Sequence, residues 1–275
     1  MKKHLLIFIF SIFCLIACDD NDLPEDYIVL DSKIIAIKIE DPEVLPGDTV
    51  YMKLLIAKNN MDQNSEIPVT WIIGEDADYQ VESKYSEGLK FAIPVDILEE
   101  EDSVDVPVIA MVTIDKKILF AEKIFRITNN PVGKNPVISG IKVDWKTDAG
   151  IQTKNITNGE TITFGPDIEN FACTSITEEL PGSGNEKLVY KWYISKSSNN
   201  DKQIEVNDKK DEIEALLGED TKAAEFKQSV VYSLTEEQGT YSVYLVVRDN
   251  KINSSDSSLD RLGTDFYYFT VNVPL

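Results

Sequence analysis

The feature that most constrains this chain is one pattern of short alternating runs that occurs twice. Apolar and polar residues alternate between turn residues, a spacing that is typical of half-buried strands. Each half carries a turn of the form glycine, acid, threonine, aliphatic residue, at Gly47–Val50 and at Gly159–Ile162. A strand centred on a tryptophan follows each turn, at Trp71 and at Trp192. The sequence therefore predicts an all-β chain built from two copies of one unit.

The segment between the copies lacks periodicity and contains two prolines, so we expect residues 130–136 to be a linker. The predicted domains are residues 31–129 and 137–275, sizes that suit two separately folded units. Within the second copy, residues 208–217 carry apolar side chains at helical spacing, and Gly218 follows as a stop. We expect one short helix inserted there.

These patterns resemble the immunoglobulin-like β-sandwiches of bacterial surface lipoproteins, including their PKD-like relatives. In the second copy, Gly239-Thr240-Tyr241 is similar to the tyrosine corner of that family, in which the tyrosine hydroxyl bonds back to the preceding turn. The family's disulfide is missing, because Cys173 stands near the first cysteine's place and Val243 near the second's. We expect Cys173 to be a small buried apolar residue. The resemblance implies two tandem sandwiches, a scaffold that hosts many functions.

The N-terminus has the layout of a signal peptide, with a short basic start and an apolar run, Leu5–Ala17, too short to span a bilayer. Leu15-Ile16-Ala17-Cys18 resembles the lipobox of bacterial lipoproteins, which implies that Cys18 is acylated and becomes the new N-terminus. Several acyl chains such as palmitate would anchor the protein permanently. We predict a signal peptide over residues 1–17 and a tether over residues 18–30. The alternative is an ordinary secretory signal that leaves Cys18 a free thiol.

Acidic residues dominate the tether behind Cys18. One interpretation is a solvated spacer that its charge keeps off the membrane. The other is a resemblance to the surface-export signals of Bacteroidota lipoproteins, which implies that the body lies outside the cell. In either case we expect a lipoprotein of the bacterial cell envelope, in the outer membrane, and the second interpretation adds exposure at the cell surface.

The charge balance narrows the range of partners and chemistries. Without residues 1–17 the chain keeps 25 basic and 48 acidic residues, so it should repel nucleic-acid phosphates and anionic lipid. We therefore expect no nucleic-acid partner and no membrane contact beyond the lipid anchor. The single histidine, His4, lies in the signal, which excludes histidine-activated nucleophiles and histidine-ligated metals. We predict no enzyme, no catalytic residue and no cofactor; a glycosidase with paired carboxylates is the remaining alternative, and no spacing selects a pair.

Strand phase predicts an aromatic patch in the second copy. If Tyr241, Trp192 and Tyr267 point inward, their neighbours on three adjacent strands point outward: Tyr193, Tyr244, Phe266 and Tyr268. Exposed aromatic patches mark contact sites, so these four residues are the candidate contact face. Three explanations stay open. The inserted helix or the first domain covers the patch, or the patch binds a protein or stacks on sugar rings, or the rings pair across strands with partial exposure.

Two acid-rich loops, residues 99–105 and 249–265, offer the oxygen ligands that calcium prefers. Neither has the spacing of an EF-hand loop, and such loops are expected in so acidic a chain, so no metal site is assigned. The sequence as a whole predicts a lipid-anchored envelope protein that acts as a non-catalytic binding or spacer module, with a protein or glycan partner. The alternative is a carbohydrate-binding accessory lipoprotein of an outer-membrane uptake system. Neither the ligand nor the oligomeric state follows from the sequence.

Overall fold

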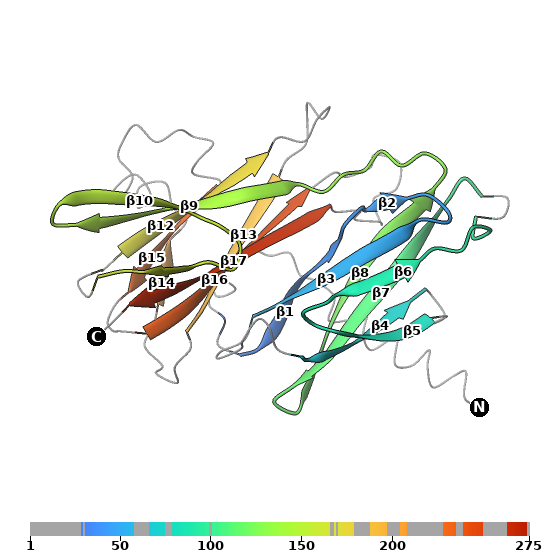
Figure 1. Cartoon of the computed structure of the whole chain (residues 1–275), viewed down its shortest axis with the longest axis horizontal. Coiled ribbons are helices and arrows are strands. Elements are labelled where there is room, and N and C mark those ends of the chain that lie inside the picture. Colours follow the sequence, from blue (N-terminus) through green and yellow to red (C-terminus); the bar gives the residue numbers. More distant parts are fainter. Residues whose placement is uncertain are drawn as a thin grey trace.

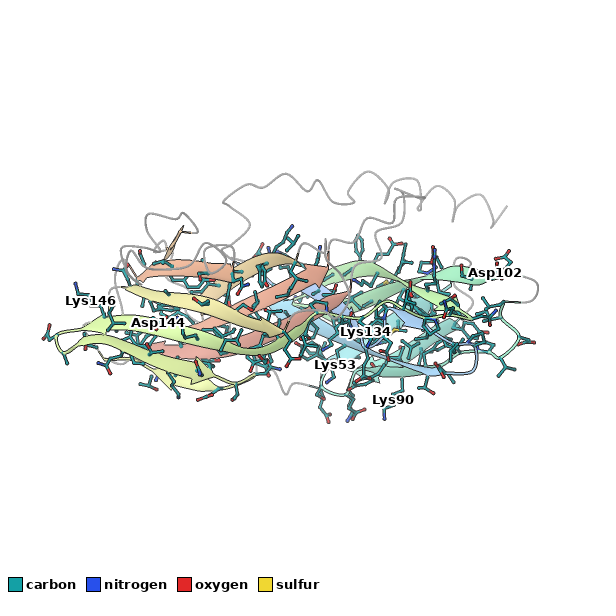
Figure 2. All side chains as sticks on the ribbon, turned by 90° about the horizontal axis from the view of Figure 1, so that it is seen from above. Lys53, Lys90, Asp102, Lys134, Asp144 and Lys146 are labelled. Carbon is teal, nitrogen blue, oxygen red and sulfur yellow. The ribbon has the colours of Figure 1, made fainter. Side chains whose placement is uncertain are left out.

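Two β-sandwiches follow one another along the long axis of the molecule in the computed structural model (Figure 1). The described residues are 29, 31–57, 66–74, 79–98, 101–165, 168, 170–178, 188–196, 204–207, 228–234, 239–249 and 263–273. In the view of Figure 2, Asp102 lies toward one end, Lys134 near the middle and Lys146 at the other end. The linker that contains Lys134 therefore sits between the two sandwiches.

The first domain contains the first eight strands: β1 (Lys33–Ile39), β2 (Glu43–Val44), β3 (Thr49–Ala57), β4 (Pro68–Ile73), β5 (Tyr79–Lys84), β6 (Leu89–Ala92), β7 (Ser103–Ile114) and β8 (Lys117–Thr128). One sheet has the order β1-β3-β6, and the other has the order β2-β8-β7-β4-β5. Neighbouring strands are antiparallel, except that the short strand β2 runs parallel to β8.

The second domain contains the remaining strands: β9 (Val137–Thr147), β10 (Gly150–Ile156), β11 (Thr161–Thr163), β12 (Asn170–Glu178), β13 (Leu188–Lys196), β14 (Ile204–Asn207), β15 (Ser229–Leu234), β16 (Gly239–Asp249) and β17 (Thr264–Val273). Its sheets have the orders β10-β9-β12-β15-β14 and β11-β17-β16-β13. Here too a short strand, β11, runs parallel to the last strand of the domain.

Both domains follow the immunoglobulin plan. In one sheet of each domain, β1 pairs with β3 and β9 pairs with β12. In the other sheet, the tryptophan strands β4 and β13 pair with β7 and β16, which form the last hairpins with β8 and β17. The domains differ at their edges, since β5 extends the tryptophan sheet of the first and β10 and β14 extend the opposite sheet of the second. The predicted all-β fold with two tandem sandwiches is confirmed. The predicted helix over residues 208–217 lies outside the described residues, as does Cys18.

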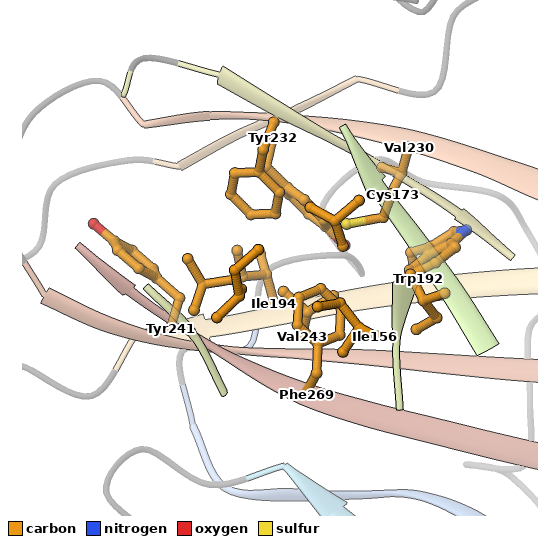
Figure 3. Packing of buried hydrophobic residues seen from close by; sticks show 14 of the residues in the cluster. Ile156, Cys173, Trp192, Ile194, Val230, Tyr232, Tyr241, Val243 and Phe269 are labelled. Carbon is orange, nitrogen blue, oxygen red and sulfur yellow. The ribbon is translucent and has the colours of Figure 1, made fainter. Parts of the chain in front are cut away.

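Each domain has its own core, because alternate residues of both sheets point inward. Trp71 is fully buried in the first core, and Trp192 is almost fully buried in the second. Figure 3 shows Cys173 among the apolar side chains of the second core, where it is a fully buried free thiol, as predicted. Tyr241 also points into this core. The hydrogen bond of its hydroxyl, which the tyrosine corner implies, stays a prediction.

The repeated turn has the same hydrogen bonds in both domains. Asp48 donates its backbone N–H to the carbonyl of Leu45 (3.2 Å), and its carboxylate accepts the Leu45 N–H (3.1 Å). Glu160 makes the same two bonds to Thr157, at 3.0 and 2.9 Å. The glycine before each acid has a positive φ, 85° and 78°, which favours that residue type. A hydrogen bond from Lys154 and those from Thr157 lower the pKa of Glu160 to about 2.

Candidate functional site at the domain junction

The four predicted aromatic side chains lie on one face of the β11-β17-β16-β13 sheet. Tyr244 stands directly opposite Tyr193 on one neighbouring strand and opposite Tyr268 on the other. Phe266 stands opposite Val246. The residues that alternate with them on these strands pack into the second core, so the strand phase predicted from the sequence is confirmed. The three tyrosines form a row across three strands.

The first domain covers this face. Tyr244 and Val246 are fully buried in a cluster whose other members come from Val29 and from strands β1 and β3: Ile35, Ala36, Leu55 and Ala57. Tyr193, Phe266 and Tyr268 pack against the same cluster and are partly buried. The first domain therefore covers the aromatic patch, which is one of the explanations that the sequence left open. In this arrangement the ring of Tyr244 is fully buried and is not available as a platform for sugar rings.

Tyr85, which follows β5, packs against the core of the first domain near the junction. Its hydroxyl accepts a hydrogen bond from the backbone N–H of Ile56 on β3 (3.4 Å). Burial raises the pKa of Tyr85 well above its usual value, and the neighbouring Tyr244 and Tyr268 act in the same direction. The phenol is therefore a neutral packing group of the junction at any physiological pH.

A buried carboxylate links the rims of the two domains. Asp265 on β17 accepts a hydrogen bond from the ammonium of Lys38 on β1 (2.5 Å) and another from the backbone N–H of Ile138 (2.9 Å). Close by, Lys123 on β8 donates to the hydroxyl of Thr264 (2.7 Å). Because a buried charge is stable only when paired and hydrogen-bonded, the closed junction needs Lys38 beside Asp265, and separation of the domains would break this pair.

The linker is held by side chains rather than left to rotate. The amide nitrogen of Asn135 donates to the carbonyls of Ile39 (2.6 Å) and Glu40 (2.7 Å), and its oxygen accepts the N–H of Thr264 (2.9 Å). Glu43 accepts two further linker N–H groups with one carboxylate oxygen, at 2.7 and 2.8 Å. One linker residue therefore bonds to both domains at once.

The segment before β1 also contacts the second domain. The N–H of Val29 donates to the carbonyl of Ile194 (2.8 Å) on β13, the edge strand of its sheet. The ammonium of Lys33 lies 4.9 Å from the ring centroid of Tyr193, a cation–π contact. The chain therefore touches the second domain before it enters the first.

The contacts of the junction are suited to holding the two domains together. Within the described ranges, no three acidic, cysteine or histidine residues gather where a metal ion could bind. Asp105, from one of the acid-rich loops, makes a bidentate pair with Arg126 (2.6 and 2.9 Å), while Asp265 pairs as described above. Burial, and to a lesser degree the charge of Asp144, raise the pKa of the Cys173 thiol, which makes it a poor nucleophile.

Sequence reasoning identified the aromatic rings but missed the polar contacts around them. Lys38 and Asp265 are 227 residues apart, and Asn135 is 96 residues from Ile39, so no local pattern links them. The only signal was an asparagine within the predicted linker. Residues 99–100 of the first acid-rich loop and residues 250–262 of the second lie outside the described residues. None of the helices in the described part is long and apolar enough to cross a membrane.

No family model and no curated protein matches this chain. Several solved structures match it at low identity. The three N-terminal domains of the highly immunogenic outer capsid protein (Hoc) of bacteriophage RB49 are 9% identical, with 89% of this chain and 100% of that chain covered and a TM-score of 0.26. Extracellular domains 3–5 of Drosophila OTK are 10% identical, with coverage of 91% and 68% and a TM-score of 0.24. The collagen adhesin of S. aureus is 10% identical, with 90% of this chain and 94% of that chain covered and a TM-score of 0.20. At these TM-scores the matches carry no argument, and the fold rests on the strand order and contacts of this chain.

Proposed function

We propose that this chain is a lipid-anchored protein of the cell envelope whose two immunoglobulin-like domains act as one stiff, non-catalytic spacer or binding module. The observation that carries the proposal is the junction. It combines an apolar cluster with four aromatic rings, a partly buried ion pair and a linker that is hydrogen-bonded to both domains. A module of this kind presents or positions something at a fixed geometry.

The stiffness has a physical basis. Domains joined by a linker alone move relative to one another by default. Here rotation would expose the fully buried Tyr244 and break the Lys38–Asp265 pair together with the bonds of Asn135. Exposure of one large buried side chain alone costs roughly 1.5–3 kcal/mol. The closed junction is therefore the favoured state.

Spin labels can test the stiffness. We would place them at Val95→Cys in the first domain and Ile151→Cys in the second, two exposed positions outside the junction. Cys173 is fully buried, so it should not compete for the label. The expected result is a single narrow distribution of distances between the labels, which Tyr268→Glu should broaden. A broad distribution in the otherwise unchanged protein would contradict the stiff module.

The lipid anchor rests on Cys18 and the residues before it. Growth of expressing cells with an alkyne analogue of palmitate should label the protein, and Cys18→Ala should abolish the label. Cys173→Ala is the matched control and should keep it. Protease treatment of intact cells then decides whether the body lies outside the outer membrane, as the acidic tether suggests. Absence of label from the unchanged protein would overturn the anchor.

A further inference from the structure

The hairpin between β7 and β8 ends in an exposed tip that differs from the rest of this acidic chain. Its two-residue turn is Asp115-Lys116, followed by Lys117. Behind the turn, two large apolar side chains are exposed to solvent, Ile118 at 70% and Phe120 at 48%. Two lysines beside exposed aliphatic and aromatic groups form an amphipathic tip in a protein with a net charge of −21.

The tip lies where the tether enters the folded body. The ammonium of Lys117 is 3.2 Å from a carboxylate oxygen of Asp31, just after Val29, which is fixed at the junction. Figure 1 shows the hairpin projecting from the first domain on the side where β1 begins. The hairpin tip is therefore a neighbour of Asp31, the residue that follows the tether.

The length of the tether limits how far this region can be from the membrane. Cys18 precedes Val29 by eleven residues. A fully extended chain gains about 3.3–3.6 Å per residue, so the tether spans about 40 Å at most. The anchor therefore holds the protein by its junction, and the hairpin tip is among the parts that it brings within reach of the lipid.

We propose that the tip of the β7–β8 hairpin is a second contact with the membrane, in which Ile118 and Phe120 enter the headgroup region and Lys116 and Lys117 bind lipid phosphates. The proposal rests on the proposed lipid anchor. Lysine and aromatic side chains are favoured at the boundary between headgroups and acyl chains, where the apolar part is buried and the charge reaches phosphate. Basic groups are also attracted to an anionic lipid surface, and salt screens this attraction little at short distances.

Net charge alone predicts no membrane contact beyond the anchor, and the hairpin changes that expectation locally. The electrostatic force on a surface within a few ångströms of lipid depends on nearby charges, since distant ones are screened. At the tip two exposed lysines stand with Asp115 and Asp31, and Lys117 is paired with Asp31. The tip is thus close to neutral, while most of the chain is acidic.

The test uses the full lipidated protein in vesicles of phosphatidylethanolamine and phosphatidylglycerol that contain no other protein. An environment-sensitive fluorophore is attached at Ile118→Cys, and Ile151→Cys is the matched control. Ile151 is also exposed, at 53%, but lies on the β9–β10 hairpin at the far end of the second domain (Figure 1). Acylation protects Cys18, and burial protects Cys173.

The expected result is that lipids with nitroxide groups quench the probe at position 118 more strongly than the probe at position 151, by about twofold or more. Lys116→Glu combined with Lys117→Glu should reduce the quenching at position 118. Equal quenching at both positions, or none at either, would overturn the membrane contact. Unchanged quenching in the double glutamate variant would overturn the role of the lysines.

Flotation of the vesicles separates this proposal from the proposed function. The unchanged protein should float with the vesicles and Cys18→Ala should not. If the unchanged protein floats and the probe at position 118 is not quenched, the anchor stands and the hairpin contact is wrong. If the unchanged protein stays in solution, the lipid anchor itself is wrong, and the hairpin contact is overturned with it.

Discussion

The outer faces of the two tryptophan sheets have the same strand register, but only the face in the second domain is covered at the junction. Trp71 stands opposite Ala110 as Trp192 stands opposite Leu245, which aligns the two sheets residue by residue. The covered face of the second domain carries Tyr193, Tyr244, Val246, Phe266 and Tyr268. The equivalent positions of the first domain carry Ile72, Ile109, Met111, Phe120 and Glu122. Four of the five positions are apolar in both domains.

The fifth position separates the two faces. Tyr268 packs at the junction, whereas the equivalent Glu122 is exposed to solvent. Burial of an unpaired carboxylate is strongly unfavourable, so Glu122 prevents the first face from packing as the second does. We expect that this one charged residue, in an otherwise apolar strand face, disfavours a junction on the first face.

The largest expected difference lies at the centre of the two faces. Tyr244→Ala should lower the free energy of unfolding by about 3–5 kcal/mol, because it opens a cavity between two packed domains. Ile109→Ala, at the equivalent but partly exposed position, should cost about 1 kcal/mol. Urea denaturation of both variants measures the two losses. Losses of similar size would mean that the first face is as well packed as the second.

Exchange of the residue at the fifth position should separate the domains. Tyr268→Glu gives the second face the pattern of the first and should cost roughly 2–3 kcal/mol, because it places a carboxylate in the apolar cluster. Calorimetry should then resolve two unfolding transitions in place of a coupled one. Glu122→Tyr is the reciprocal control and should leave the stability almost unchanged. A single unshifted transition in Tyr268→Glu would remove the charge at this position as the explanation.

The sequence was sufficient for what depends on alternation. The phase of Tyr193, Tyr244 and their neighbours follows from a two-residue period and from the turn signals. The burial of Cys173 was expected from the resemblance to the immunoglobulin-like family. What lies against the aromatic face did not follow, because Val29 and β1 meet β16 across more than 200 residues of chain and no local pattern pairs them. An average over the whole chain also conceals a hairpin tip with two adjacent lysines.

The two core tryptophans offer a smaller contrast. The indole Nε1 of Trp71 donates to the hydroxyl of Ser83 (2.9 Å), whereas that of Trp192 is buried without a hydrogen-bond partner among the described residues. Replacement by phenylalanine removes a similar volume at both sites. Trp71→Phe should therefore cost about 1 kcal/mol more than Trp192→Phe, the value of one lost hydrogen bond. Chemical denaturation measures the difference, and equal costs would show that Trp192 also donates a hydrogen bond.

The smallest effect concerns the tight hairpin of each domain. Asp115 and Lys116 have φ values of 50° and 66°, as in a type I′ turn, which suits the twist of β7 and β8 but strains side chains other than glycine. The β9–β10 hairpin instead places Gly150 at a φ of 110°. Lys116→Gly should stabilise the protein by about 0.5–1 kcal/mol, because relief of left-handed strain exceeds the added entropy of the unfolded chain.

Gly150→Ala should have the opposite sign. A Cβ atom there meets nothing within 4 Å, so the expected loss of about 1 kcal/mol comes from backbone strain alone. Lys116→Gly also removes one of the two lysines of the proposed membrane contact. Its stability in solution should therefore rise while the quenching of a probe at position 118 falls. A fall in both would mean that Lys116 supports the fold of the hairpin rather than its contact with lipid.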